Sequence, residues 1–128
     1  MDVSYKPNNY STVSPYLIVD GASATIDFLT VVFDAIELRR FSDAAGKVMH
    51  AEVRLDDTVI MLADAAEGWP ALQAHVHIYV PDVDAAYQRA LAAGATSVQE
   101  PLKKEDDDKR GGVKDVGGIT WWIATKVA

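Results

Sequence analysis

Residues 15–35 read PYLIVDGASATIDFLTVVFDA, and this stretch predicts a buried strand that leads directly into an amphipathic helix. The apolar run at 16–19 is short, as buried strands are, and Asp20 with Gly21 ends it. Between residues 22 and 33 apolar side chains recur at spacings of three and four, which places them on one helical face. We expect Asp20 or Ser23 to cap this helix.

The same order of elements returns about 61 residues later, where residues 76–95 read VHIYVPDVDAAYQRALAAGA. The turn at residues 56–57 likewise recurs at 117–118. Each unit reads β-α-β-β-β, and one unit alone has too little sheet and helix to bury a core. The pairing of two units therefore predicts an α+β fold, in which one curved mixed sheet has its helices outside and a central cleft inside.

The remaining elements follow from alternation, turns and helix stops. Besides the strand at 16–19 and the helix Ala22–Phe33, we expect strands at Ala35–Phe41, Lys47–Leu55, Thr58–Leu62, His75–Val80, Thr96–Gln99, Val113–Val116 and Ile119–Ala124, a helix at Val83–Ala93, and loops at Ala63–Gln73 and Pro101–Gly112. Residues 1–12 are a polar leader that we expect to fray, and 13–128 form a single domain, with repeat one at 13–65 and repeat two at 75–125.

Composition excludes several classes of protein and of site. The formal net charge of −7 argues against a nucleic-acid partner and against an anionic membrane surface. The chain has no cysteine, which excludes disulfides and thiolate metal sites and fits a cytoplasmic protein. No apolar run approaches the roughly 20 residues needed to span a bilayer, and residues 1–9 have no apolar core for a secretory signal.

Seven short segments together resemble one known family. They are Pro15–Gly21, Phe33–Ala35, Gly46–Glu52, Met61–Asp64, Tyr79–Asp84, Ala92–Ala95 and Trp121. In this order they resemble the vicinal oxygen chelate superfamily, also called the glyoxalase/bleomycin-resistance/dioxygenase family, and within it the PhnB-like branch. The resemblance implies the doubled fold, a cleft between sheets, and a homodimer in which the partner can complete the cleft.

Catalytic members of this family hold a divalent metal through His and Glu side chains. The resemblance places their four ligand positions at Val13, at Met61 or Leu62, at His75 and at Trp122. Only His75 keeps a ligand side chain, and one imidazole does not hold a catalytic cation. We therefore expect no metal cofactor, with His75 as the single weak candidate ligand.

The period of two along the strand at 75–80 places His75, His77 and Tyr79 on one face. The resemblance directs this face toward the cleft, where these side chains would contact a ligand. Trp121 and Trp122 point to opposite faces, so we expect Trp121 in the core and Trp122 in the pocket, stacked on an aromatic ligand. Trp69 and Tyr79 could add a second wall; ordinary packing of Trp122 is the alternative.

Alternation in the strand at 47–55 places Met49, Ala51, Val53 and Leu55 on one face and His50, Glu52 and Arg54 on the other. His50 and Glu52 could line the cleft or join His75 in an improvised metal site. The plainer interpretation is a polar face with an internal pair between Glu52 and Arg54. Arg110 lies in a run of mixed charges that reads as a solvated loop, yet Lys109 or Arg110 could close over an anionic ligand.

The leading hypothesis is a small-molecule-binding protein of this superfamily that sequesters a partly aromatic ligand without a metal, as antibiotic-binding resistance relatives do. The alternative is an atypical divalent-metal-dependent lyase, isomerase or dioxygenase-like enzyme that uses His75 with His50, His77 or Glu52. A third hypothesis is an interaction module with a vestigial cleft.

Overall fold

The computed structural model describes residues 5–128 as eight strands and two helices, in the order that the repeat predicts. The elements are β1 (Tyr16–Val19), α1 (Ala22–Phe33), β2 (Ile36–Ser42), β3 (Val48–Leu55), β4 (Thr58–Asp64), β5 (Ala74–Tyr79), α2 (Val83–Ala92), β6 (Thr96–Lys103), β7 (Asp108–Lys114) and β8 (Ile119–Lys126). The α+β fold of two β-α-β-β-β repeats is confirmed. Within the described residues, no helix is long and apolar enough to cross a membrane.

The strands form two mixed sheets, with orders β1-β4-β3-β2 and β5-β8-β7-β6. In the N-terminal sheet, Tyr16 of β1 lies opposite Met61 of the parallel strand β4. In the C-terminal sheet, His77 of β5 lies opposite Trp122 of the parallel strand β8. Both pairs are related by the same offset, since 16 to 77 and 61 to 122 are each 61 positions. The repeat in the sequence is therefore a repeat in strand register.

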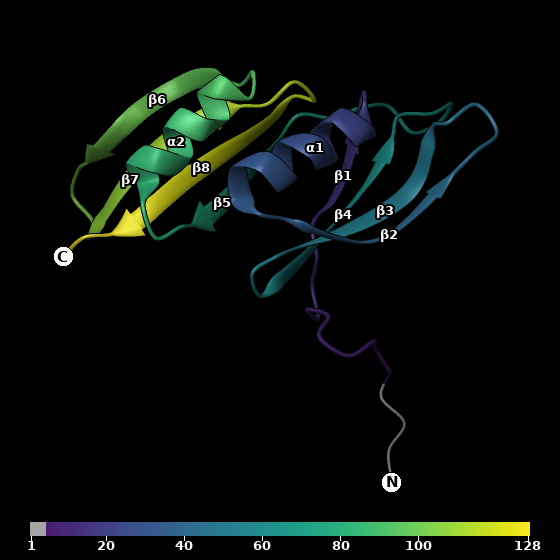
Figure 1. The fold of residues 1–128 in the computed structure, drawn as a ribbon, viewed down its shortest axis with the longest axis horizontal. Coiled ribbons are helices and arrows are strands. Elements are labelled where there is room, and N and C mark those ends of the chain that lie inside the picture. The colour runs from purple at the N-terminus through teal and green to yellow at the C-terminus, as the bar shows by residue number, and fades with distance from the viewer. Residues whose placement is uncertain (1–4) are drawn as a thin grey trace, which may run out of the picture.

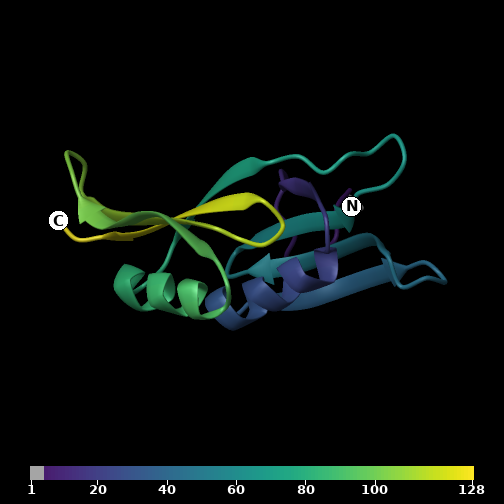
Figure 2. The ribbon, with the colours of Figure 1, turned by 90° about the horizontal axis from the view of Figure 1, so that it is seen from above.

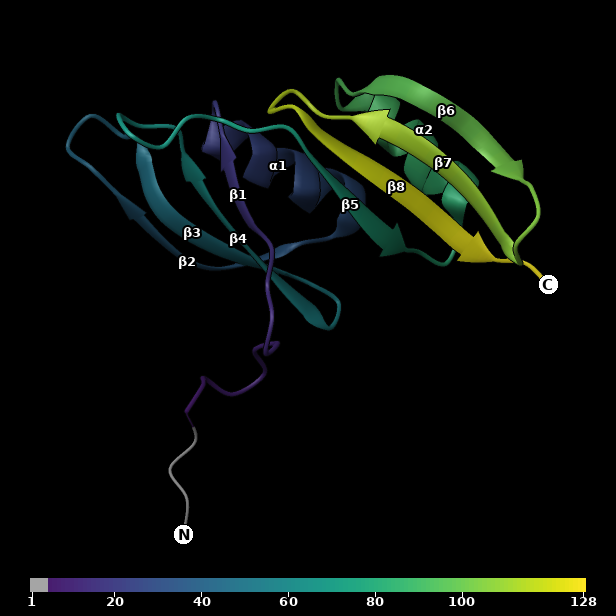
Figure 3. The same ribbon diagram turned by 180° about the vertical axis from the view of Figure 1, so that it is seen from behind.

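Both helices cover the same side of the molecule. They lie in front of the sheets in Figure 1 and behind them in Figure 3, where the opposite faces of both sheets are turned toward the viewer. From above, α2 runs along the C-terminal sheet, and α1 lies beside α2 (Figure 2). The structure therefore leaves one face of each sheet without a covering helix, and these two open faces lie on one side of the chain.

The two halves meet where α1 packs against the second repeat. Trp121 of β8 is completely buried, and its ring centroid lies 5.5 Å from that of Phe33 at the end of α1. The Arg89 guanidinium of α2 donates two hydrogen bonds of 3.1 Å to the Val32 carbonyl oxygen, also at the end of α1. The core placement predicted for Trp121 is confirmed, and an arginine of one repeat satisfies a carbonyl that the other helix leaves free.

The predicted loop at Pro101–Gly112 is wrong. β6 and β7 form an antiparallel hairpin that takes in most of this segment, with Leu102 opposite Arg110. The charged run that indicated a loop, residues 103–110, lies at the end of β6, in the turn and at the start of β7. β6 is the edge strand of this sheet. Pro101 is tolerated because an edge strand leaves one side of its backbone unpaired, and the register shift between Gln99 and Leu102 accommodates it.

The predicted helix cap is also wrong. Neither Asp20 nor Ser23 caps α1, which begins after Gly21 in a left-handed conformation at φ 80°. Asp64 at the end of β4 accepts hydrogen bonds from the backbone N–H groups of Gly21 and Ala22, at 3.0 and 2.7 Å. A carboxylate more than 40 positions away thus satisfies the helix start, where negative charge is favoured. In the second repeat Asp82 caps α2 locally, through the N–H of Ala85.

The alternation expected in β3 holds from Ala51 onward and fails before it. Met49 is 64% exposed, whereas its neighbour Val48 is buried. The reason is a register shift against β2, where Phe41 pairs with His50 but the next residue pairs with Val48. The extra residue in β3 is Met49, and such a bulge turns its side chain out of the alternating pattern.

The contact of Arg89 with α1 gives a stability prediction. Replacement of Arg89 by alanine removes two charge-assisted hydrogen bonds to Val32, so we expect the free energy of unfolding to fall by about 1 kcal/mol. Urea unfolding followed by circular dichroism measures this loss. The matched control is Gln88→Ala, an exposed neighbour on the same helix, for which we expect a change within about 0.5 kcal/mol. Equal effects of the two substitutions would contradict the role given to Arg89.

Candidate functional site

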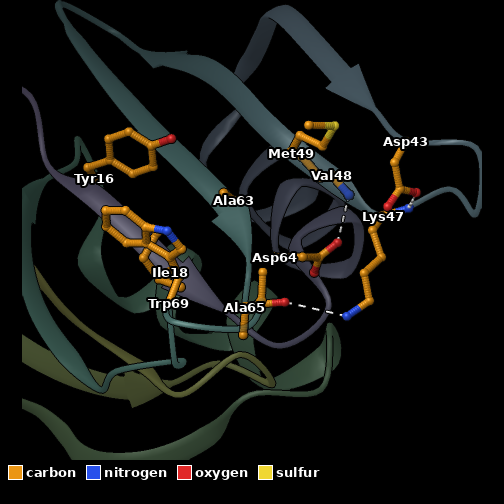
Figure 4. A pocket seen from close by; sticks show the side chains of 11 residues that line it. Tyr16, Ile18, Asp43, Lys47, Val48, Met49, Ala63, Asp64, Ala65 and Trp69 are labelled. Atoms are coloured by element: carbon orange, nitrogen blue, oxygen red, sulfur yellow. Dashed lines mark hydrogen bonds between the residues drawn. The ribbon is translucent and has the colours of Figure 1, made fainter.

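A pocket of about 620 Å³ opens on the N-terminal sheet. It is lined by Tyr16, Ile18, Asp43, Lys47, Val48, Met49, Ala63, Asp64, Ala65, Ala66 and Trp69. Figure 4 shows the Tyr16 and Trp69 rings at one end of the pocket and Lys47 with Asp43 at the other. The lining is mostly apolar, with few polar groups, and its volume falls in the range of small-molecule sites, roughly 300–1,000 Å³.

The Trp69 side of this pocket is built by the loop between β4 and β5. Trp69 forms a two-residue bridge with Ala66, through backbone hydrogen bonds of 2.8 and 2.9 Å in both directions. The indole itself is 67% exposed, so the loop presents it without burying it. An exposed indole fixed by its backbone offers a flat apolar surface to a ligand at little entropic cost.

Beside the pocket, Glu52 of β3 lies buried at the centre of a polar network. One carboxylate oxygen accepts hydrogen bonds from the Tyr10 hydroxyl and from Arg39 Nε, the latter at 2.7 Å. The other accepts from His50 Nε2 at 2.7 Å. The predicted pair between Glu52 and Arg54 is not formed, because Arg54 donates to the carbonyl oxygen of Asn9 and Arg39 of β2 takes its place.

The protonation state of Glu52 follows from these partners. Burial alone would raise the pKa of this carboxyl, but hydrogen bonds from Tyr10, His50 and Arg39, together with the charge of Arg39, lower its pKa to about 2. Glu52 is therefore a carboxylate at neutral pH, and a carboxylate only accepts hydrogen bonds. The same contacts hold Tyr10 in place, so this part of the polar leader is anchored on the sheet.

His50 connects the buried carboxylate to the pocket. Its Nε2 contacts Glu52, and its Nδ1 lies 2.8 Å from the Tyr16 hydroxyl oxygen. The Tyr16 ring meets the imidazole edge-on at 5.3 Å, and Phe41 of β2 stacks on it at 6.4 Å between centroids. A chain of hydrogen bonds thus runs from the buried Glu52 through His50 to a tyrosine on the pocket wall.

A second cluster lies on the open face of the C-terminal sheet. The Trp122 indole N–H donates to His75 Nδ1 at 3.0 Å, and the two rings are nearly parallel, with 6.2 Å between centroids. Trp122 lies flat over Gly112 of β7, since a Cβ at Gly112 would come within 2.7 Å of the indole ring. A glycine at that position is therefore required by the ring, and Trp122 is half-buried on the sheet face.

Arg110 of β7 is held by three partners in this cluster. It donates to His77 Nε2 at 3.1 Å, to Asp106 at 3.1 Å and to Asp108 at 2.9 Å. Tyr79 also donates to Asp108, at 2.7 Å. Burial and the neighbouring Arg110 charge lower the pKa of His77, which favours the neutral imidazole. With its charge balanced by two carboxylates, Arg110 is poorly suited to close over an anionic ligand.

The side chains at the family's metal positions do not fit a metal. Val13 lies before β1 and is 81% exposed, and Trp122 carries an indole N–H that offers no lone pair. His75 uses Nδ1 to accept the Trp122 proton, so its neutral ring carries its own proton on Nε2, where a cation would bind. Within residues 5–128 no group of three or more His, Asp or Glu side chains is placed to hold a metal ion.

The predicted site residues thus fall into two groups. His50, Glu52 and Trp69 lie in or beside the pocket of the N-terminal sheet, while five others gather on the C-terminal sheet: His75, His77, Tyr79, Arg110 and Trp122. Trp69 lies at the N-terminal sheet and Trp122 lies in the C-terminal sheet, so within one chain they do not form two walls of the same pocket. Sequence reasoning missed Tyr16, which the short apolar run placed simply in a buried strand, and Asp108, which the charged run concealed.

Glu52 gives a pH prediction. Because its folded pKa of about 2 lies below the usual 4.5, its contribution to stability is complete above pH 4.5 and is lost as the pH falls toward 2. We expect the wild type to lose about 2 kcal/mol more unfolding free energy over this window than Glu52→Gln does. Urea titrations at several pH values measure the difference. Glu67→Gln, on an exposed loop, is the control, and an identical acid response of wild type and Glu52→Gln would refute the assignment.

Comparison with known proteins gives relatives over nearly the whole chain. An uncharacterized protein of Mycobacterium bovis is 36% identical over an alignment of 129 positions, which covers 90% of this chain and 83% of the relative. Among solved structures, TioX from Micromonospora sp. ML1 superposes with a TM-score of 0.77 at 25% identity, covering 91% of this chain and 99% of TioX. TnmS3, an antibiotic binding protein from Streptomyces sp. CB03234, gives a TM-score of 0.68 at 18% identity, covering 91% and 99%.

The likeness to TnmS3 shows a shared fold, and the family follows from the sequence itself. Residues 11–123 match the Glyoxalase/Bleomycin resistance protein/Dioxygenase superfamily. The match spans both repeats, from the segment before β1 to the middle of β8. The chain therefore belongs to the glyoxalase/bleomycin resistance/dioxygenase superfamily.

Proposed function

We propose that this protein binds and sequesters a small, partly aromatic molecule without using a metal. The observation that carries the proposal is the pocket of about 620 Å³ on the N-terminal sheet, with Tyr16 and Trp69 at one end and the apolar side chains of Ile18 and Met49 along its walls. Apolar and aromatic walls with a few polar groups are typical of sites that hold flat organic ligands.

The polar groups near the pocket support binding better than metal chemistry. Glu52 and His50 are bonded to each other and to neighbouring side chains, so their lone pairs are already in use. His75 is engaged by Trp122 in the other sheet. An antibiotic is one ligand class that suits such a pocket, and TnmS3, which shares the fold, is an antibiotic binding protein.

We also place the chain in the PhnB-like branch, on the segments around Pro15–Gly21 and Gly46–Glu52.

We further propose that the protein works as a homodimer in the cytoplasm. The open sheet faces carry large exposed side chains, among them Phe41 at 55%, Met49 at 64% and Tyr79 at 64% exposed. Apolar side chains gathered on one side of a chain are typical of surfaces that a partner covers. A second copy would also supply the C-terminal cluster of His75, His77, Tyr79, Arg110 and Trp122 as the opposite wall of the ligand site.

The binding proposal is tested with 1-methoxynaphthalene, an aromatic probe, followed through the three tryptophan indole N–H signals in nitrogen-15 NMR spectra. We expect the Trp69 signal to shift on titration, because its ring lines the pocket, and the buried Trp121 signal to stay in place. Trp69→Ala should weaken binding about tenfold, since stacking contributes on the order of 1 kcal/mol beyond the buried area.

Leu72→Ala is the matched control for this experiment. Leu72 lies in the same loop as Trp69 and is equally exposed, at 66% against 67%, but it does not line the pocket. We expect it to bind the probe as the wild type does. A probe that shifts none of the indole signals, or that binds Trp69→Ala unchanged, would refute the pocket as the ligand site.

Metal analysis separates the proposal from the metalloenzyme alternative. Protein purified without chelator should carry well under one equivalent of Zn, Ni, Mn or Fe, because the side chains at the family's ligand positions include an aliphatic group and an indole. Plasma mass spectrometry measures this content. A stoichiometric ion that is lost in His75→Ala would overturn the metal-free proposal and favour a lyase, isomerase or dioxygenase-like enzyme.

A further inference from the structure

The hydrogen-bond chain from Glu52 to the pocket determines whether the Tyr16 hydroxyl donates or accepts in its hydrogen bond with His50. Glu52 is ionised and accepts only, so the proton between it and His50 must lie on His50 Nε2. In a neutral imidazole the other nitrogen then has a free lone pair, and Nδ1 is an acceptor. The Tyr16 hydroxyl, 2.8 Å from Nδ1, is therefore the donor in that hydrogen bond.

This arrangement leaves the Tyr16 oxygen with lone pairs and no proton to offer to the pocket. A phenol has one O–H donor, and His50 receives it. The hydroxyl points from the ring toward the side of the pocket where Met49 lies (Figure 4). Tyr16 as a whole residue is 51% exposed and is one of the lining residues of the pocket. Tyr16 thus presents a hydrogen-bond acceptor on the wall of an otherwise apolar pocket.

Glu52, His50 and Tyr16 form a hydrogen-bond relay, and the groups around this relay keep the direction of its hydrogen bonds. Arg39 and Tyr10 donate to Oε1 of Glu52, and His50 contacts the other oxygen, Oε2. The His50 imidazole makes an edge-on contact with the Tyr16 ring and a stacked contact with the Phe41 ring, and these two contacts restrict its rotation. Glu52 and His50 are therefore positioning residues that act through Tyr16.

We propose that the pocket selects aromatic ligands that carry a hydrogen-bond donor, such as a phenolic hydroxyl or an aryl N–H, and that the Tyr16 oxygen accepts this hydrogen bond. The inference rests on the proposed function, since it names the ligand class for the same pocket. A ligand with only an acceptor at that place faces the lone pairs of the Tyr16 oxygen and gains nothing from it. Sites that hydrogen-bond one ligand group discriminate well against analogues that lack it.

The test compares 1-naphthol with 1-methoxynaphthalene, which share the ring system but differ in the donor. Affinities are measured by calorimetry and by the Trp69 indole signal at about pH 8, which lies above the ordinary imidazole pKa of roughly 6.5. We expect the wild type to bind 1-naphthol about five to ten times more tightly, as one hydrogen bond provides. In Tyr16→Phe, which keeps the ring, the two affinities should become equal, while that for 1-methoxynaphthalene stays close to the wild-type value.

Two further variants test the relay itself. His50→Leu frees the Tyr16 proton to turn toward the pocket, so the preference for 1-naphthol should fall at least threefold although Tyr16 is intact. Leu72→Ala is the matched control, since Leu72 is exposed in the loop that carries Trp69 but does not line the pocket, and it should keep the full preference.

The outcomes separate this inference from the proposed function. Equal binding of both probes by the wild type, or a preference that survives Tyr16→Phe, would overturn the donor selectivity and leave the aromatic pocket intact. An undiminished preference in His50→Leu would overturn the relay. If neither probe shifts the Trp69 signal, the pocket itself fails, and the donor selectivity fails with it.

Discussion

The packing of the first helix against the second repeat is the contact on which the rest of this structure depends. Each repeat has one helix for four strands, and that is too little to bury a core. The fully buried Trp121 closes the gap by packing against Phe33, and Arg89 of α2 binds the last turn of α1 through Val32. Both helices are thereby used on the same side, so the opposite face of each sheet stays open. The pocket lined by Tyr16 and Trp69 opens on such an uncovered face.

The open faces carry polar networks because strands covered on one side alternate buried with solvent-facing residues. On the N-terminal sheet the network is centred on Glu52, whose negative charge is matched by Arg39. On the C-terminal sheet it is centred on Arg110, whose charge is matched by Asp106 and Asp108. The central charge is negative on the N-terminal sheet and positive on the C-terminal sheet, although Glu52 and Arg110 lie in corresponding strands of the two repeats, β3 and β7. On both open faces the central charge is therefore paired with neighbouring side chains of opposite charge.

Much of the fold could be predicted from local patterns. The helix at Ala22–Phe33 was predicted with its observed bounds, because its apolar spacing and the flanking turn residues are local signals. The β6–β7 hairpin was missed because the charged run in its turn and at the start of β7 looks like that of a solvated loop. The cap of α1 was missed for a different reason: Asp64 reaches the helix only after β4 is paired beside β1. A contact across more than 40 positions leaves no local trace in the sequence.

The sequence by itself determined the doubled β-α-β-β-β fold and the opposite faces of Trp121 and Trp122, because periodicity and residue type are properties of the chain alone. Only the tertiary structure decided which polar groups meet. It paired Glu52 with Arg39 rather than with Arg54 and brought Tyr16 to His50, because strand register sets which side chains of different strands lie within hydrogen-bond distance.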